Sequence, residues 1–293
     1  MCRWGATPFV RAVLFLALLT SPGCAPSDRP EILALATAGT GGVYYVLGGS
    51  IAEFWSRELP EQDFVAEVTG GSVENLSLLL AGDVQVAFSM GTNAHEVFNA
   101  TGSFAGRDPA QVLALAALYP NVLHLVTLEG TGVESLSDLV GRRVSVGAPG
   151  SGTEVGARTL LEGNGIGYDD FQPQRLNFNE TASALRDGNI DAGFLSAGPP
   201  TSAIMDLATA RPIRLVPIGV AEVDNTSALD PTVSRDFFPP GTYPGQELEV
   251  ETLSTPNLLV VRADMSDDLV YELTRALFEV QAELVGVHPA ARH

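Results

Sequence analysis

Short aliphatic or β-branched runs alternate with helical patterns along most of this chain. The first series has expected strands at 32–37, 64–68 and 84–89, separated by expected helices at 43–57 and 72–81. Strands and helices that alternate in this way are typical of βαβ units, which form a mostly parallel sheet with helices on its faces. The pattern therefore predicts an α/β fold.

A second series of the same kind begins at residue 143. The expected strands are 143–147, 175–178, 190–195 and 213–218, and the expected helices are 153–163, 180–187 and 200–208. A further helix is expected at 266–285, with Ser266 as its N-cap.

One stretch supports a relation between the two series. Gly82-Asp83-Val84-Gln85-Val86-Ala87-Phe88 corresponds to Gly188-Asn189-Ile190-Asp191-Ala192-Gly193-Phe194. In both, a glycine is placed to end a helix and a short strand follows. Many αβ units share that order, so an incidental likeness is the alternative. We interpret the pattern as two related α/β lobes, one formed by residues 31–128 plus 252–293 and the other by residues 129–250.

The charges of the chain exclude several functions. All 16 basic residues are Arg, and 35 acidic residues give a net charge of −19. Schiff-base enzymes, pyridoxal-phosphate enzymes and P-loop NTPases need a lysine at the reacting centre or on the phosphates. Nucleic-acid binding needs clustered cations, and no basic stripe is present. We expect no nucleic-acid partner.

The first 23 residues are typical of an export signal. Arg3 and Arg11 precede an apolar stretch at 12–19, which is too short to span a bilayer. Cleavage before Cys24 would leave this cysteine at the start of the mature chain, where bacterial lipoproteins are lipidated; the alternative is an ordinary signal peptide with an incidental cysteine. We expect a protein in the periplasm or on the outer face of the cytoplasmic membrane.

Two glycine-rich turns are candidate anion sites. They are Gly39-Thr40-Gly41-Gly42 and Gly147-Ala148-Pro149-Gly150-Ser151-Gly152-Thr153, and each follows a strand and opens a helix. Unpaired backbone N–H groups and the positive end of a helix dipole point outward from such a turn. Tight turns that bind nothing are the structural alternative.

The sequence does not match the common motifs of enzymes or metal sites. A dinucleotide fingerprint would need glycine at Tyr44 or Val155, and a Walker motif starting at Gly147 offers Thr153-Glu154 where Lys and Ser or Thr belong. A G-x-S-x-G elbow is missing, and the position for a second zinc-binding His after His95-Glu96 holds Asn99. We expect no cofactor, no metal and no catalysis, although an exported α/β enzyme assembled from scattered residues stays an alternative.

Several motifs together resemble a known family. The motifs are Gly39-Thr40-Gly41-Gly42-Val43-Tyr44-Tyr45, Thr69-Gly70-Gly71-Ser72-Val73-Glu74-Asn75-Leu76, Val146-Gly147-Ala148-Pro149-Gly150-Ser151-Gly152-Thr153-Glu154 and Tyr243-Pro244-Gly245-Gln246. In this order they resemble the solute-binding subunits of TAXI-type TRAP transporters, from about Ile32 to Ala291. The family usually has Pro where Val46 stands and a different turn at Met90-Gly91-Thr92, and it continues beyond the position of His293.

The resemblance implies a two-lobed type II periplasmic-binding-protein fold, each lobe a mostly parallel sheet flanked by helices. It also implies a small organic anion as ligand, of the glutamate, glutamine or dicarboxylate class, and the subunits of a TRAP-type membrane permease as partners. An ABC-type or sensory binding protein is the alternative of the same fold. We expect a monomer, with hinges near 127–132 and between 217 and 256.

The expected ligand contacts are small polar or aromatic residues near strand ends and helix starts. They are Thr40, Gly41, Gly42, Tyr44, Ser72, Asn75, Gly91, Thr92, Tyr119, Ser151, Gly152, Thr153, Asn179, Ser196 and Gly198. We expect Tyr44 in the cleft and Tyr45 packed inside, because successive helical residues point about 100° apart. No Arg lies in either turn, so neutral donors and helix dipoles are expected to hold a carboxylate.

Overall fold

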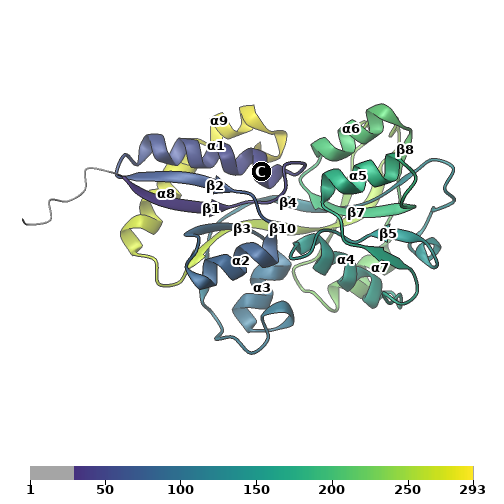
Figure 1. Ribbon diagram of the computed structural model, residues 1–293, viewed down its shortest axis with the longest axis horizontal. Helices are drawn as coiled ribbons and strands as arrows, with labels where there is room; N and C mark the ends of the chain where they lie inside the picture. The colour runs from purple at the N-terminus through teal and green to yellow at the C-terminus, as the bar shows by residue number, and fades with distance from the viewer. Residues whose placement is uncertain (1–29, 293) are drawn as a thin grey trace, which may run out of the picture.

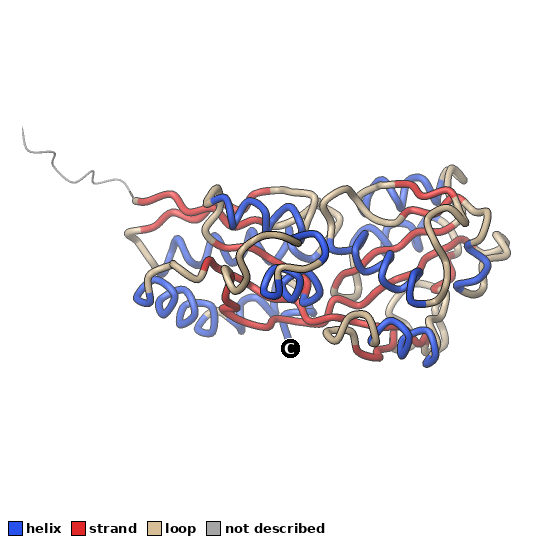
Figure 2. The backbone as a smooth tube through the Cα atoms, turned by 90° about the horizontal axis from the view of Figure 1, so that it is seen from below, coloured by secondary structure: helices blue, strands red, loops and turns tan. Residues whose placement is uncertain are grey.

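The structure is a computed structural model that describes residues 30–292 of the chain. Two bodies lie side by side along the long axis, and two long strands, β4 (Val112–Leu128) and β10 (Val250–Arg262), run through both (Figure 1). We call residues 30–120 with 256–292 the first half and residues 121–255 the second half. Figure 2 shows the same extended outline from below.

The first half is built on three parallel strands, with β1 between the other two. They are β1 (Glu31–Ala36), β2 (Gln62–Glu67) and β3 (Val86–Met90). Its helices lie on both sheet faces (Figure 1): α1 (Val43–Glu58), α2 (Ser72–Ala81), α3 (Gly91–Asn99), α8 (Asp267–Glu279) and α9 (Gln281–Val287), with short 3-10 turns at Gly102–Phe104 and Pro289–Arg292.

The second half repeats this plan with β5 parallel to its two neighbours. Its strands are β5 (Arg143–Ser145), β6 (Gln172–Gln174), β7 (Ala192–Ala197), β8 (Ile213–Leu215) and β9 (Ser234–Phe238). Its helices are α4 (Gly152–Gly163), α5 (Phe178–Arg186), α6 (Ser202–Ala210) and α7 (Val220–Ser227), with a 3-10 turn at Leu136–Leu139.

Both halves share one sheet, whose order is β2-β1-β3-β10-β4-β7-β5-β6. Strands β8 and β9 pair with β4 and β10, and every pairing of a crossing strand is antiparallel. Each half thus combines a parallel set of strands with antiparallel crossing strands. The predicted α/β architecture is confirmed.

Separate apolar cores stabilise the two halves. Trp55 on α1 is fully buried in the first, and its indole N–H donates to the Leu273 carbonyl on α8 at 3.1 Å. Phe194 on β7 is fully buried in the second. Burying one such large side chain contributes about 1.5–3 kcal/mol, so each half has its own source of stability.

Most predicted elements are present within a few residues, and the helix predicted at 72–81 is confirmed at both ends. The strand predicted at 175–178 is wrong. Asn177 instead caps α5, because its side chain accepts from the Glu180 N–H and the Glu180 carboxylate accepts from the Asn177 N–H. The single helix predicted at 266–285 is also wrong, since it breaks at Val280 into α8 and α9.

The two crossing strands were not predicted. Pro120 lies inside β4 and Pro256 inside β10, and proline normally argues against a central strand because it cannot donate to the ladder. The alanine-rich start of β4 also lacks the polar and apolar alternation of a half-buried strand.

The expected signal peptide at 1–23 and the lipidation site at Cys24 lie outside the described residues. Within residues 30–292, every helix is too short or too polar to cross a membrane.

Candidate ligand-binding site

A cavity of about 420 Å³ lies between the two halves, and both contribute to its walls. The first half supplies the turns before α1 and α2 with the end of β3: Ala38, Gly39, Gly42, Val43, Tyr44, Val68, Thr69, Gly70, Gly71, Ser72 and Met90. The second half supplies the starts of α4 and α5 and the end of β7: Ala148, Pro149, Ser151, Gly152, Thr153, Asn177, Phe178, Glu180, Ser196 and Ala197.

The turn before α1 leaves the start of that helix without a side-chain cap. Gly42 is the N-cap and has no side chain to donate or accept, and the first turn of α1 contains no acidic residue. The positive end of a 16-residue helix therefore faces this part of the cavity.

Tyr44 lies at the cavity wall, where its ring stacks on Phe88 at 4.8 Å between centroids. Its hydroxyl accepts from the Asn121 side-chain amide at 3.1 Å. Burial raises the pKa of Tyr44 to about 12, so the phenol stays protonated. Tyr45 is 41% exposed, and the prediction that it packs inside is wrong, because α1 turns only one face toward the sheet.

Asn75 supports the turn before α2 from behind. Its amide N–H₂ donates to the carbonyls of Thr37 (2.6 Å) and Phe88 (2.9 Å), and its oxygen accepts from the Thr69 hydroxyl at 2.5 Å. The side chain is fully buried and does not line the cavity. Its position fits a supporting role better than the ligand contact predicted for it.

The turn before α4 is stabilised by its own side chains. Gly147 and Gly150 have φ of +103° and +75°, which strongly favours glycine at both positions. The Ser151 hydroxyl accepts from the Glu154 N–H at 3.2 Å and so caps α4. The Thr153 hydroxyl accepts from the Ser196 N–H at 3.3 Å, which joins the start of α4 to the end of β7.

Gly152 permits a close approach between the halves. A Cβ atom at this position would lie 2.6 Å from Asn93 Oδ1 and Met90 Sδ and 2.8 Å from Ser72 Oγ, all in the first half. In addition, the Val73 and Glu74 N–H groups at the start of α2 both donate to the Gly150 carbonyl at 3.0 Å. The halves are therefore in direct contact along this side of the cavity.

The opposite rim is closed by the first glycine turn. The Gly41 carbonyl accepts from the Thr201 hydroxyl at 2.8 Å and from the Ser202 hydroxyl at 3.1 Å. The Asn179 amide donates to the Thr40 hydroxyl at 3.1 Å. Thr40, Gly41 and Asn179 thus lie at the rim and connect the halves, outside the cavity lining itself.

A buried chain of hydrogen bonds supports Thr201. His124 Nδ1 faces the carbonyls of Val122 (2.9 Å) and Leu195 (3.1 Å), so it carries the ring proton and Nε2 accepts from the Tyr243 hydroxyl at 2.8 Å. The Tyr243 hydroxyl in turn accepts from the Thr201 N–H at 3.0 Å. Burial lowers the pKa of His124 to about 4, which keeps the ring neutral.

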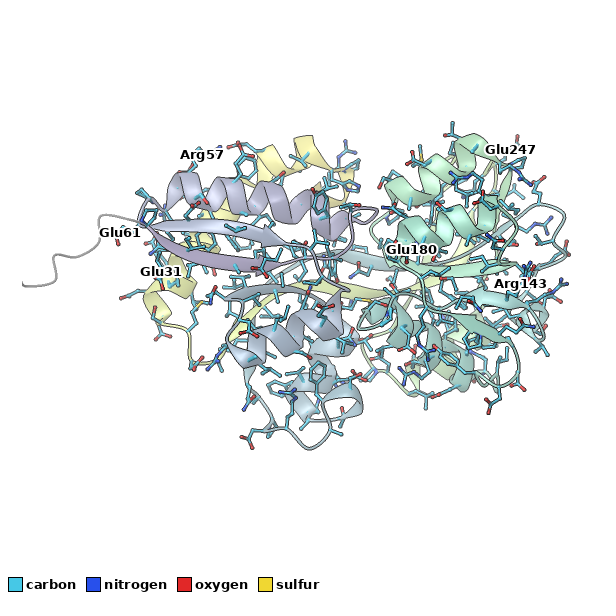
Figure 3. All side chains as sticks on the ribbon, viewed as in Figure 1. Glu31, Arg57, Glu61, Arg143, Glu180 and Glu247 are labelled. Atoms are coloured by element: carbon cyan, nitrogen blue, oxygen red, sulfur yellow. The ribbon has the colours of Figure 1, made fainter. Side chains whose placement is uncertain are left out.

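The charges at the cavity are few. Glu180, labelled at the start of α5 in Figure 3, is the one acidic or basic side chain among the described lining residues, and its carboxylate accepts from the Asn177 N–H at 2.8 Å. Arg175 lies over the Tyr168 ring, and Arg214 pairs with Glu134 at 2.8 Å. Neither Arg lines the cavity.

Comparison of the sequence with models of known protein families identifies the family of this chain. A model described as the NMT1-like family matches residues 35–293. The chain belongs to the NMT1-like family.

Solved structures show the same architecture. A putative L-cystine ABC transporter protein from Listeria monocytogenes has 15% identity and a TM-score of 0.55, over 88% of this chain and 94% of that one. The alkanesulfonate-binding protein SsuA from Xanthomonas axonopodis pv. citri, bound to MOPS, has 14% identity and a TM-score of 0.53, over 90% of this chain and 83% of that one. The substrate-binding protein of an amino acid ABC transporter has 11% identity and a TM-score of 0.54, over 87% of this chain and 97% of that one. These likenesses show that the NMT1-like chain has the two-lobed binding-protein fold expected from its sequence.

The predicted contacts divide into three groups in this NMT1-like structure. Those that line the cavity are Gly42, Tyr44, Ser72, Ser151, Gly152, Thr153 and Ser196. Thr40, Gly41 and Asn179 lie at the rim, as described. The others do not line the cavity: Asn75, Gly91, Thr92, Tyr119 and Gly198.

Three of the residues that do not line the cavity have other neighbours. The Thr92 hydroxyl donates to the Asp230 carboxylate at 2.6 Å and so joins α3 to the second half. A Cβ at Gly198 would lie 2.9 Å from the Tyr119 ring, so these two pack against each other. A direct ligand contact for them stays a prediction that their positions do not favour.

Sequence reasoning missed part of the lining. Val68, Met90 and Phe178 contribute apolar walls, and Asn177 lies beside them. Apolar residues at the ends of strands have no polarity signal that separates them from core residues. Among residues 30–292, no group of three or more His, Cys, Asp or Glu side chains is arranged to hold a metal ion.

Proposed function

We propose that this NMT1-like protein is an extracytoplasmic solute-binding protein that captures a small organic carboxylate for a membrane transporter. The observation that carries the proposal is the cavity between the halves, which both halves line and which hydrogen bonds between them enclose at the rim. A volume of about 420 Å³ suits a small solute. The export signal expected at residues 1–23 supports a location outside the cytoplasm, with Cys24 as the proposed lipid anchor.

The two halves act as lobes that close on the ligand. A ligand favours closure only by binding the closed form more tightly, and contacts from both halves provide that difference. The lobe boundaries expected from sequence fell at 128/129 and 250/252. We propose slightly different crossing points, Pro120–Val122 and Ser254–Asn257, because the crossing strands change partners there.

The cavity chemistry favours a carboxylate group at the start of α1, on a body of moderate size, whereas Glu180 disfavours an anion at the start of α5. Neutral donors are available from Ser72 and Tyr44, whereas the Ser151 hydroxyl already donates to the Ala148 carbonyl at 2.7 Å. The uncapped start of α1 adds the positive end of its dipole. That dipole contributes about 0.3–1 kcal/mol, or up to about 2 when partly buried. Apolar walls from Val43, Met90 and Phe178 suit the rest of the ligand.

We propose a TRAP-type permease of the TAXI kind as the partner, because the motifs at 39–45, 69–76, 146–154 and 243–246 occur together in order. An ABC transporter is the second candidate, since two of the named structural relatives are described as parts of ABC transporters. Uptake into vesicles separates the two. An ion gradient without ATP would drive a TRAP permease, whereas an ABC transporter would need ATP.

The hydroxyls in the cavity support binding rather than catalysis. Ser72 Oγ accepts from the Met90 N–H at 3.1 Å, and Thr153 Oγ1 accepts from the Ser196 N–H. Neither is hydrogen-bonded to a His or a carboxylate that could take its proton, as a nucleophile would require.

Mass spectrometry of the denatured protein tests the ligand class, since a closed cavity of this kind retains its solute during purification. Glutamate, glutamine and 2-oxoglutarate are then titrated by calorimetry. We expect one carboxylate ligand and a smaller radius of gyration when it is bound. An amine without a carboxylate, or an unchanged radius of gyration with contacts from one half only, would contradict the proposal.

A further inference from the structure

The two crossing strands have a weak point where they leave one half and enter the other. Pro120 on β4 lies directly opposite Pro256 on β10, and the pairing shifts register between Pro256 and Leu258. Proline has no N–H, so neither residue can donate a ladder hydrogen bond. The two strands therefore lack backbone hydrogen bonds from both residues at this point of the sheet.

Unpaired polar groups surround the proline pair. Tyr119 and Asn121 flank Pro120, Asn257 follows Pro256, and all three side chains are 4% exposed or less. Five buried side-chain atoms among residues 30–292 find no hydrogen-bond partner in the protein, and four belong to these residues: Tyr119 Oη, Asn121 Oδ1, Asn257 Oδ1 and Asn257 Nδ2. Buried polar groups are rarely left unpaired, because the loss of hydration is then not offset.

The same cluster reaches the cavity through a single hydrogen bond. The Asn121 amide donates to the hydroxyl of Tyr44, which lines the cavity. The Asn257 side chain also lies near the Tyr119 hydroxyl and opposes the rise that burial causes in the pKa of that phenol, although the two groups do not meet the geometry of a hydrogen bond. A change at the hinge is therefore adjacent to the ligand.

We infer that Tyr119, Asn121 and Asn257 form a polar hinge switch whose unpaired groups gain partners when the halves separate. The contacts of Gly41 with Thr201 and of Gly150 with the start of α2 show that this structure is the closed arrangement. In it, the unpaired groups oppose closure. The switch thus biases the empty protein toward the open form. It also sets how much binding free energy the ligand must supply to close the halves. This inference rests on the proposed closure of the two lobes.

Two substitutions remove unpaired groups with little change in shape. Asn257→Leu replaces both unpaired amide atoms by methyl groups, and Tyr119→Phe removes one oxygen. Because each removes a cost specific to the closed form, the closed-to-open ratio should rise, by about tenfold for Asn257→Leu and by less for Tyr119→Phe. Asn99→Leu is the matched control, since Asn99 is exposed on α3, away from the hinge.

The measurement is the distance between spin labels on the full chain. The labels are placed at Gly49 on α1 and Asp206 on α6, both exposed, with Cys2 and Cys24 changed to serine. Bound solute is first removed by unfolding in guanidinium chloride and refolding, and thermal unfolding confirms that each variant is folded. We expect two distances in the empty protein and a shift toward the shorter one in Asn257→Leu and Tyr119→Phe only.

Unchanged populations in both variants, or a shift toward the longer distance, would overturn the switch. A single unchanging distance would overturn it together with lobe closure. Because the readout needs no ligand, it stays separate from the ligand test. The hinge can respond even if no carboxylate is found, and a carboxylate can bind even if the hinge does not respond.

Discussion

The two glycine turns at the cavity have the same order of strand, turn and helix, but they differ at the helix start. The turn before α4 has a Ser151 cap and Glu154 in its first helical turn. The turn before α1 has neither a side-chain cap nor an acidic residue. The turn before α4 therefore forms a wall that is stabilised by its own side chains. The turn before α1 leaves its helix dipole without a side-chain partner, as the proposed carboxylate site requires.

The largest expected effect comes from Gly152→Ala. The added methyl group would meet Asn93, Met90 and Ser72 of the first half, so the halves could not close fully. We expect affinity for the co-purified solute to fall about 10- to 100-fold, since overpacking a close contact costs about 1–3 kcal/mol. Calorimetry measures the loss.

Two matched variants sharpen this result. Gly49→Ala adds a methyl group on α1 with no atom within 4 Å and should leave affinity unchanged. Gly41→Ala should cost less than Gly152→Ala, because the main obstacle is the exposed side chain of Asn179, which can move. Equal losses at Gly41 and Gly152 would contradict the difference between the two turns.

Acid should weaken the hydrogen-bonded chain that holds the glycine turn before α1. His124, which holds Tyr243 and through it Thr201, has its pKa lowered to about 4 by burial, whereas the unfolded chain takes up this proton near pH 6.5. The free energy of unfolding should therefore fall as the pH drops from about 6.5 toward 4, by up to about 3 kcal/mol.

Denaturant unfolding at pH 7 and pH 5 measures this dependence. His124→Gln should be less stable at pH 7 and should lose less stability on acidification than the original chain, because its side chain does not titrate. The same drop in both proteins would show that other groups cause the pH dependence.

Loss of the cap on α4 should have a smaller effect. Ser151→Ala removes the acceptor for the Glu154 N–H and should cost about 1 kcal/mol of stability, or about 2–4 °C in Tm. Ser266→Ala removes the corresponding cap of α8, far from the cavity, and should cost a similar amount without any change in binding. If both variants bound solute equally well, Ser151 would be a cap and not a ligand contact.

The smallest effect tests the open end of α1 directly. Tyr45 is exposed in the first turn of this helix, and Tyr45→Glu adds a negative charge near the proposed carboxylate. Affinity should fall about two- to fivefold at low salt, corresponding to about 0.3–1 kcal/mol, and less in high salt. Tyr45→Gln is the neutral control. Tighter binding by Tyr45→Glu would indicate that the ligand does not place an anion here.

The sequence predicts those parts of the site that depend on local structure. Gly42 and Gly152 could be identified because a glycine turn between strand and helix has a local signature. Thr92 and Tyr119 could not be placed, because their neighbours come from Asp230 and Gly198, which are distant in sequence. The direction of a side chain at a strand end depends on packing that no local pattern describes.

The fold shows the same division. Most βαβ elements follow from periodicity, but β4 and β10 conflict with their own proline residues. These strands are stabilised by neighbours on both sides in the sheet, so tertiary pairing outweighs the local preference. The family resemblance supplied the two-lobed arrangement, which periodicity alone left as an interpretation.

The position of β10 in the sheet determines the order in which the halves can be completed during synthesis. Its residues 257–261 insert between β3 and β4, so the sheet of the first half stays open until these residues have left the ribosome. The second half is one continuous segment and needs no later strand. Long-range pairing of this kind folds slowly. The amino-terminal part of the protein, although made first, is therefore expected to reach its native structure last.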